Sequence, residues 1–188
     1  MKDLVFVTGN IDKVTLLEQF LGYKVTHRDL DLPEIQSLDV KAIVYQKTLD
    51  AYKVLKKPVL VDDASLSINA LGGLPGPLVK FFLKAVGGEG ICRMVDGHDD
   101  RSATTSLLFG LYDGKDFYSF EAEVSGSISQ SPRGNISKLT KMGWNPIFIP
   151  TGQDKTVAEM PESQLAEYTP RGHAAKKLAE FLKDRSNP

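Results

Sequence analysis

Two adjacent acids, Asp62 and Asp63, follow the apolar run 59–61 directly. The run predicts a short buried strand, and the ligands of α/β sheets bind beyond the carboxyl ends of such strands. Neighbouring carboxylates can divide a hydrolytic reaction there, because one can hold Mg²⁺ while the other accepts a proton from water. A surface turn with a helix cap would explain the pair equally well, so the pair alone favours neither interpretation.

A second candidate is the segment 8–13, which reads Thr-Gly-Asn-Ile-Asp-Lys between an expected strand and an expected helix. Free amides at a helix N-terminus attract anions, and Gly9 would let the backbone approach a phosphate. Thr8, Asn10 and Lys13 would complete such a site. An ordinary turn capped by Asn10, with Lys13 in solvent, is the more common origin of this pattern. The Gly-Lys-Ser/Thr ending of a P-loop is missing.

Three further charged residues indicate a functional site only when they are considered together. Glu34 follows a proline in Leu-Pro-Glu-Ile-Gln and alone would be an exposed loop acid. Lys47 and Lys80 fall on expected helices, where a lysine usually extends its charge into solvent. Each is therefore a candidate ligand or phosphate contact only if the fold brings it beside the acidic pair.

The segment 142–150 could recognise an aromatic base. Trp144 and Asn145 lie between Gly143 and a proline, and together with Met142 they could stack on a base and hydrogen-bond its edge. A packed loop with Trp144 in the core is an equal alternative. Arg171, further along the chain, could direct its planar fork at a phosphate or a base edge.

The elements expected to position these residues alternate between strand and helix at both ends of the chain. We expect a strand within 4–8, a helix over 11–21, a strand over 23–28, a helix over 38–56 and a strand over 59–61. A rigid loop over 71–77 precedes helices over 78–86 and 88–95. Strands over 103–112 and 117–128 should form a hairpin, and 161–182 should be helical with a break near 169–170. This order predicts one mixed α/β domain over residues 1–188.

Composition narrows the class of protein. The chain has 188 residues, 41% hydrophobic and 25% charged, with a net charge of -1. The absence of a basic excess argues against a protein that coats a nucleic acid polymer. A single cysteine, Cys92, excludes an internal disulfide, and no apolar run reaches the roughly 18 residues of a membrane helix. We therefore expect a cytoplasmic protein that does not enter a membrane.

Taken in order, the motifs resemble those of the inosine/xanthosine triphosphate pyrophosphatase family, whose members remove deaminated purine nucleotides. The resemblance extends from Phe6 to Leu182. The series is Thr-Gly-Asn-x-x-Lys, Glu-Ile-Gln, an acidic pair after an apolar strand, Leu-Gly-Gly-x-Pro-Gly-Pro, Gly-Trp-Asn-Pro-x-Phe, Ala-Glu-Met, and Arg-Gly before a C-terminal helix. This ordered series is far more specific than any one of its members.

The resemblance implies an elongated α/β fold with two lobes around a central nucleotide-binding cleft, usually as a homodimer. It implies Mg²⁺- or Mn²⁺-dependent hydrolysis of a purine nucleoside triphosphate to the monophosphate and pyrophosphate. Glu34 and Asp62 or Asp63 would hold the metal, and Asp63 matches the catalytic acid of the family. By the same matching, the remaining positions would bind substrate: Thr8, Gly9, Asn10, Lys13, Lys47, Lys80, Met142, Gly143, Trp144, Asn145 and Arg171.

Departures from the family pattern gather in the half that would enclose the base. Met142 replaces an aromatic residue, Asn145 an aspartate, Leu165 a lysine and Pro170 a histidine. Residues 134–142 are also longer than usual. In the metal half, the usual Glu-Asp-Ser-Gly becomes Asp-Asp-Ala-Ser over residues 62–65. The chemistry therefore carries over from the family more firmly than the identity of the base does.

Two other functions compete with this interpretation. The chain could catalyse the same reaction on a different nucleotide base, which the altered base half favours. It could also be a nucleotide-binding sensor with weakened catalysis. The retention of Glu34, both aspartates, Lys13 and Lys47 argues against the sensor, because a protein that only binds nucleotide has less need of a complete metal site.

Overall fold

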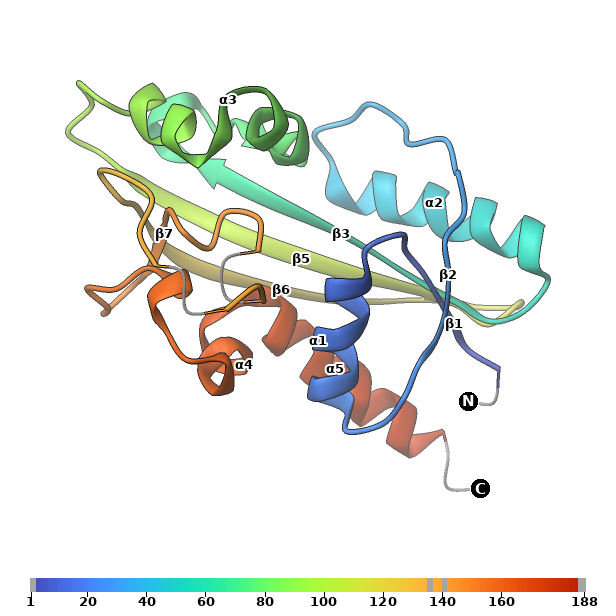
Figure 1. The fold of residues 1–188 in the computed structure, drawn as a ribbon. Helices are drawn as coiled ribbons and strands as arrows, with labels where there is room; N and C mark the ends of the chain where they lie inside the picture. Colours follow the sequence, from blue (N-terminus) through green and yellow to red (C-terminus); the bar gives the residue numbers. More distant parts are fainter. Residues whose placement is uncertain (1–2, 135–136, 140–141, 186–188) are drawn as a thin grey trace. The chain divides into compact units, whose positions relative to one another are not determined.

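The computed structural model describes residues 3–134, 137–139 and 142–185. They form a mixed α/β fold (Figure 1). Its strands are β1 (Val5–Val7), β2 (Thr26–Arg28), β3 (Val59–Ile68), β4 (Pro75–Gly76), β5 (Ser102–Tyr112), β6 (Phe117–Ile128) and β7 (Phe148–Pro150). Its helices are α1 (Ile11–Leu21), α2 (Val40–Leu55), α3 (Val79–Met94), α4 (Leu165–Tyr168) and α5 (Pro170–Asp184). Three short 3₁₀ helices are η1 (Asn69–Leu71), η2 (Val157–Glu159) and η3 (Glu162–Gln164).

The described strands form one seven-stranded sheet in the order β2-β1-β3-β5-β6-β7, with β4 paired to β3. The chain divides into two compact units that share the long strands. The first unit comprises residues 1–63, 107–122 and 173–188, and the second comprises residues 64–106 and 123–172. Neither unit is a continuous stretch of sequence.

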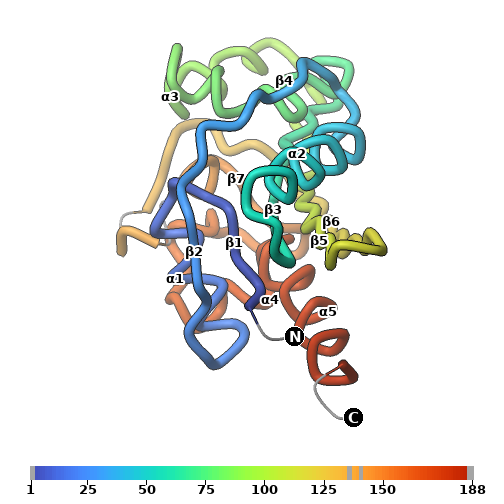
Figure 2. The backbone as a smooth tube through the Cα atoms, turned by 90° about the vertical axis from the view of Figure 1, so that its right-hand side faces the viewer, coloured from blue at the N-terminus to red at the C-terminus, as the bar shows by residue number. Residues whose placement is uncertain are grey.

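In the first unit, the parallel strands β2, β1 and β3 form a layer between helices. Val5 pairs with Thr26 on one side and with Val59 on the other. Figures 1 and 2 show α2 on one face of these strands and α1 on the other. The core on the α2 face consists of Val5, Val7, Val44, Ala51, Val59, Val61 and Leu108.

The opposite face of these strands carries the alternate residues, because side chains along a strand point to the two faces in turn. Phe6 and Leu60 are fully buried, and the Phe6 ring meets Phe109 edge to face at 6.2 Å between centroids. The two buried faces fix the register of β1 against β3, since a slip by one residue would exchange them.

The second unit contains the antiparallel pairs. Leu66 of β3 pairs with Gly76 of β4, and Ile128 of β6 pairs with Phe148 of β7. Helix α3 is interrupted at Gly87, whose φ of 66° and ψ of -179° are not helical. The expectation of two helices separated near residue 87 is therefore confirmed.

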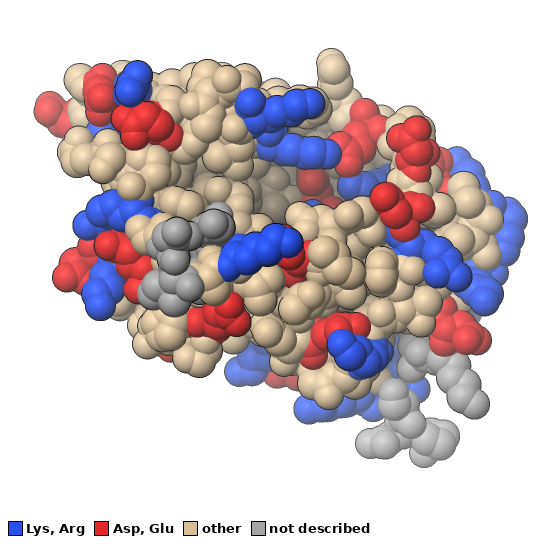
Figure 3. Space-filling model, viewed as in Figure 1, with Lys and Arg blue, Asp and Glu red and all other residues tan. Residues whose placement is uncertain are grey.

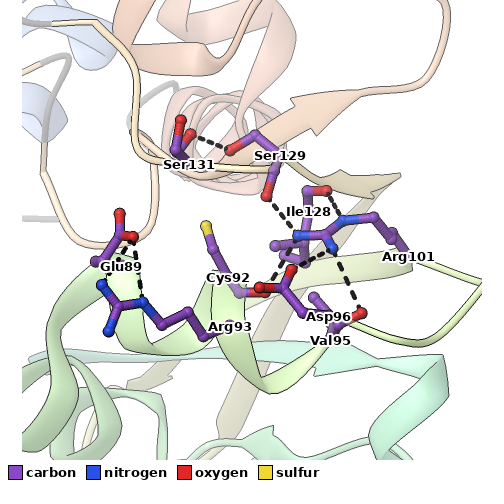
Figure 4. A network of polar contacts seen from close by, with 9 residues as sticks. All are labelled: Glu89, Cys92, Arg93, Val95, Asp96, Arg101, Ile128, Ser129 and Ser131. Carbon is purple, nitrogen blue, oxygen red and sulfur yellow. Dashed lines mark hydrogen bonds and ion pairs between the residues drawn. The ribbon is translucent and has the colours of Figure 1, made fainter.

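One partly buried guanidinium, that of Arg101, joins three parts of the second unit (Figure 4). Arg101 donates from Nε to the Ile128 carbonyl at 2.9 Å and from Nη2 to the Ser129 carbonyl at 2.7 Å. It also donates to the carbonyls of Cys92 and Val95 near the end of α3. Because carbonyls at a helix C-terminus lack helical partners, Arg101 satisfies them and fixes α3 to the end of β6.

Several expectations need correction. The strand expected to end before the acidic pair continues to Ile68, so Asp62 and Asp63 lie inside β3. The strand expected over 23–28 is confined to Thr26–Arg28. The short strands β4 and β7 were not expected, because their pairing depends on distant partners and not on a local pattern. Helix 11–21 and the 103–112 and 117–128 strands are confirmed to within one residue.

The described part of the chain contains no helix with the length and apolar character needed to cross a membrane.

The packing of α2 on β5 gives a test of this core. A methyl group on Gly110 would lie 2.5 Å from Val44 Cγ1 and 2.7 Å from Thr48 Oγ1. We expect Gly110→Ala to lower the free energy of unfolding by about 1–3 kcal/mol through overpacking, measured by urea denaturation. Combining it with Val44→Ala should cost less than the sum of the single changes.

Ser119→Ala is the control for this prediction, because Ser119 is exposed on β6. Its free energy of unfolding should stay within about 0.5 kcal/mol of the parent protein. Strict additivity of Gly110→Ala and Val44→Ala would contradict the proposed contact.

Candidate functional site

The turn between β1 and α1 is organised by its own polar side chains. The Thr8 hydroxyl accepts a hydrogen bond from the Asn10 amide at 3.1 Å, and Asn10 Oδ1 accepts one from the Asp12 amide at 2.9 Å. Asn10 therefore caps α1, as the simpler interpretation of this segment held. The cap does not exclude an anion site, because the turn still presents the positive end of the helix dipole.

Gly9 lies in close contact with Asp29, which sequence analysis did not identify. A Cβ atom on Gly9 would lie 2.6 Å from Asp29 Oδ1. The bare Cα of Gly9 therefore lets this carboxylate approach the turn, and no larger residue would fit there without displacing it. Asp29 follows β2 and lies twenty positions away in sequence, so no local pattern indicates the contact.

Lys13 and Asp62 form a largely buried ion pair in the first unit. Lys13 Nζ lies 3.1 Å from Asp62 Oδ1 and 3.0 Å from Oδ2. The side chain of Asp62 is 2% exposed and that of Lys13 is 25% exposed. Because a buried carboxylate without a counter-charge is strongly unfavourable, Lys13 on α1 and Asp62 on β3 depend on each other.

Lys47 of α2 is the second cation of the site. Its Nζ lies 2.7 Å from Glu34 Oε1, and its side chain is 17% exposed. Burial alone would lower the pKa of Lys47, but the hydrogen bond with Glu34 and the negative charges of Glu34, Asp62 and Asp63 raise it above its usual value. Lys47 therefore stays charged at neutral pH, bonded to Glu34 and near enough to Asp62 and Asp63 for their charges to raise its pKa.

The acidic pair lies where the parallel part of the sheet ends. Phe6 pairs with Leu60 and β1 ends at Val7, so of the three parallel strands only β3 continues through residues 62 and 63. Alternation along β3 places Asp62 on the face of Leu60, toward Lys13, and places Asp63 on the face of Val61, where α2 packs. The two carboxylates thus serve opposite faces of one strand.

In this structure Glu34 and Asp62 each have a lysine partner. Within residues 3–134, 137–139 and 142–185, no three histidine, cysteine, aspartate or glutamate side chains are grouped so as to hold a metal ion. On the face drawn in Figure 3, acidic and basic side chains are interspersed in the same way.

The remaining candidate residues belong to the second unit. Lys80 is exposed on α3, and Arg171 is 6% exposed at the start of α5. Met142, Gly143, Trp144 and Asn145 occupy the turn before β7. Of these four, Asn145 is the most buried at 9% exposure, and Trp144 is half-buried.

Backbone hydrogen bonds shape this turn, residues 142–146, which we call the base turn. The Asn145 amide donates to the Met142 carbonyl at 3.2 Å, and the Asn145 carbonyl accepts from the Ala158 amide at 3.1 Å. The second contact comes from η2, which sequence analysis did not connect with the base turn. The pattern Thr156-x-x-Glu159 is a capping-box signature and could have located the start of η2.

Comparisons with known proteins agree with this architecture. The sequence model of the Ham1 family matches residues 4–181. An inosine triphosphate pyrophosphatase from Schizosaccharomyces pombe (strain 972 / ATCC 24843) is 39% identical over 191 residues, which cover 100% of this chain and 98% of that protein.

Two solved structures have the same fold. The Staphylococcus aureus Ham1 protein superposes with a TM-score of 0.82 at 23% identity, covering 97% of this chain and 100% of that one. A HAM1 protein from Coxiella burnetii gives a TM-score of 0.80 at 22% identity, covering 96% and 98%. The family match over residues 4–181 and the full-length relative establish that this chain belongs to the Ham1 family.

Proposed function

We propose that this chain hydrolyses inosine or xanthosine triphosphate, or their deoxy forms, to the nucleoside monophosphate and pyrophosphate. The observation that carries the proposal is the occurrence of two ion pairs, Lys13–Asp62 and Lys47–Glu34, near the end of the parallel strands, with Asp63 next along β3 and close enough to affect the Lys47 pKa. The printed name of the relative that is 39% identical over the full length supports the same reaction.

The two lysines would bind the triphosphate. Lys13 follows the Thr8–Gly9–Asn10 turn at the N-terminus of α1, so that turn and the Lys13 ammonium would face the same phosphates. Lys47 approaches from α2 on the other face of the strand. Neutralising the charge of the phosphates supplies most of the catalysis in phosphoryl transfer, and a water-poor site strengthens that effect.

The acids suit a hard divalent cation by their chemistry, but the described side chains are not grouped for a metal here, so they would have to move together to hold one. Glu34, Asp62 and Asp63 offer only oxygen ligands, which Mg²⁺ and Mn²⁺ prefer. Each of the pairs Lys13–Asp62 and Lys47–Glu34 would exchange partners on binding, with the lysine turning to phosphate and the carboxylate to the cation. When bound, the cation would supply a positive charge that polarises the phosphate oxygens.

Asp63 would act as the general base. It is less buried than Asp62, so a water molecule can approach its carboxylate more readily. A water oxygen would form a bond to the α-phosphorus, the bond from that phosphorus to the bridging oxygen would break, and pyrophosphate would leave. The Asp63 carboxylate would accept the water proton.

The second unit would recognise the base. Trp144 would stack on the purine, and Asn145 would hydrogen-bond its edge. Arg171 would also contact the base edge, and Lys80 would contact the phosphates. The side chain of an asparagine can both donate and accept hydrogen bonds, whereas a carboxylate at neutral pH can only accept them. Met142 offers a flexible side chain where the family pattern has an aromatic platform, so stacking should be weaker.

The setting in which this reaction occurs is part of the proposal. We infer a single catalytic domain over residues 1–188, acting as a cytoplasmic homodimer on free nucleotides and not on nucleic acid polymers. The net charge of -1 and the single, buried, unpaired Cys92 support the ligand class and a reducing compartment.

The direct test is pyrophosphate release from a panel of nucleoside triphosphates. With Mg²⁺ present, inosine and xanthosine triphosphates should be cleaved to monophosphate and pyrophosphate in equal amounts. EDTA should abolish release, and added Mg²⁺ or Mn²⁺ should restore it, because the triphosphate charge and the acids otherwise repel each other. Release of orthophosphate, or turnover unchanged by EDTA, would refute the proposed reaction.

Asp63→Asn tests the general base. We expect turnover to fall by roughly a hundredfold or more with the fold intact, since general-base contributions are about 10²–10⁴. Asp31→Asn, an exposed acid of the loop that follows β2, is the matched control and should keep full turnover. Near-normal turnover of folded Asp63→Asn would remove Asp63 from the mechanism.

Asn145→Asp tests base selection. Hypoxanthine and xanthine carry a 6-oxo group and a protonated N1, which a carboxylate can accept from, whereas adenine has a bare N1. The native ratio of kcat/KM for inosine over adenosine and guanosine triphosphates should be below roughly 10⁴, and the substitution should raise the ratio over adenosine triphosphate. A native ratio already above that value, or one unchanged by the substitution, would contradict loosened base recognition.

A further inference from the structure

The Ala-Glu-Met motif has no role in the proposed chemistry, yet it lies beside the base turn. It occupies residues 158–160, and Glu159 completes a capping box with Thr156 at the start of η2. Glu159 Oε2 accepts a hydrogen bond from the Thr156 amide at 2.8 Å, while the Thr156 hydroxyl accepts one from the Glu159 amide. Thr156 is fully buried, so these groups replace contacts that water cannot supply.

The same two residues hold the segment that contains Arg133. The Thr156 hydroxyl donates to the Arg133 carbonyl at 3.0 Å, and Arg133 Nε lies 3.5 Å from Glu159 Oε2. A Cβ atom on Gly134 would lie 2.4 Å from the Ala158 carbonyl oxygen, so the two backbones are in direct contact. We call Arg133, Thr156 and Glu159 the brace.

Two backbone amides bond to the base turn, one from Arg133 of the brace and one from Ala158, the neighbour of Glu159. The Ala158 amide, one residue before Glu159, donates to the Asn145 carbonyl at 3.1 Å. The Arg133 amide donates to the Pro146 carbonyl at 2.8 Å. The carbonyls of Asn145 and Pro146 are therefore held by two segments, one containing Ala158 and the other Arg133. The Glu159 carboxylate and the Thr156 hydroxyl join these two segments.

We infer that Glu159 is a positioning residue that sets the pose of Trp144 and Asn145 and thereby the choice of base. The inference rests on the proposed function for its substrate and on the brace for its geometry. Glu159 does not touch the reacting phosphates in this scheme, because it acts only through the backbone of the base turn. Its loss should therefore change discrimination between bases and leave the rate of the chemical step nearly unaltered.

Base discrimination gives the first readout. Glu159→Ala leaves the buried Thr156 amide without its acceptor, and we expect the inosine-to-adenosine ratio of kcat/KM to change by about tenfold, mainly through KM. Glu159→Gln keeps an acceptor for that amide and should stay close to the native ratio. Glu162→Ala, an exposed glutamate three residues further on, is the matched control and should change nothing.

Trp144 gives a second readout that needs no substrate, because it is the only tryptophan of the chain. Glu159→Ala should shift the emission of Trp144 and increase its quenching by acrylamide, whereas Glu162→Ala should not. Should Glu159→Ala fail to unfold cooperatively, Thr156→Val serves instead, since it removes both hydroxyl bonds at nearly constant volume. It should alter the emission and the base ratio in the same direction.

The outcomes separate the two proposals. A folded Glu159→Ala or Thr156→Val that retains native Trp144 fluorescence and the native base ratio would overturn the brace. A fall in kcat that is equal for every base would also overturn it, because that result indicates damage to the chemical step. If the native protein cleaves no triphosphate, the proposed function fails and Trp144 fluorescence alone decides the inference.

Discussion

The contact between Lys13 and Asp62 joins α1 to β3 at the end of the parallel strands. Asp62 is almost fully buried within β3, where an ionised carboxylate is unfavourable unless a cation accompanies it. Lys13 supplies that cation from the first turn of α1, so the turn that precedes it is held against the sheet. Asp63 is the next residue along β3, so its side chain points to the opposite face of the strand. One ion pair therefore links the turn before α1 to the strand that carries both carboxylates.

This arrangement also balances charge before any ligand arrives. Glu34 and Asp62 each have a lysine partner within hydrogen-bonding distance. A triphosphate and a divalent cation together could replace those partners in one exchange, with anion meeting lysine and cation meeting carboxylate. The triphosphate alone would pair with the lysines and leave the carboxylates without a counter-charge, and the cation alone would do the reverse. The structure thus gives a physical reason to expect that the two ligands bind more tightly together than separately.

Local sequence patterns predicted the positions of helices and strands well, but they did not predict the contacts between those elements. Helix α1 was expected at its observed bounds, because Val14, Leu17 and Leu21 follow helical spacing and Gly22 ends the helix. The continuation of β3 was missed, since aspartates are uncommon in strands and two in succession resemble a turn. The ordered motifs gave the family, which the comparisons confirm. The pairing of Lys13 with Asp62 spans 49 positions, and no periodicity or cap encodes such a contact.

The division of the chain has a consequence for its synthesis. The first unit needs residues 1–63, then 107–122, and finally the stretch from 173 onward. Helix α5 adds Ala174, Ala175 and Leu178 to the buried side chains. Because α5 follows every segment of the second unit in the sequence, a ribosome makes the whole second unit before it makes the helix that packs in the first. Asp62 and Asp63 are therefore synthesised long before the α5 side chains that bury apolar surface in their own unit.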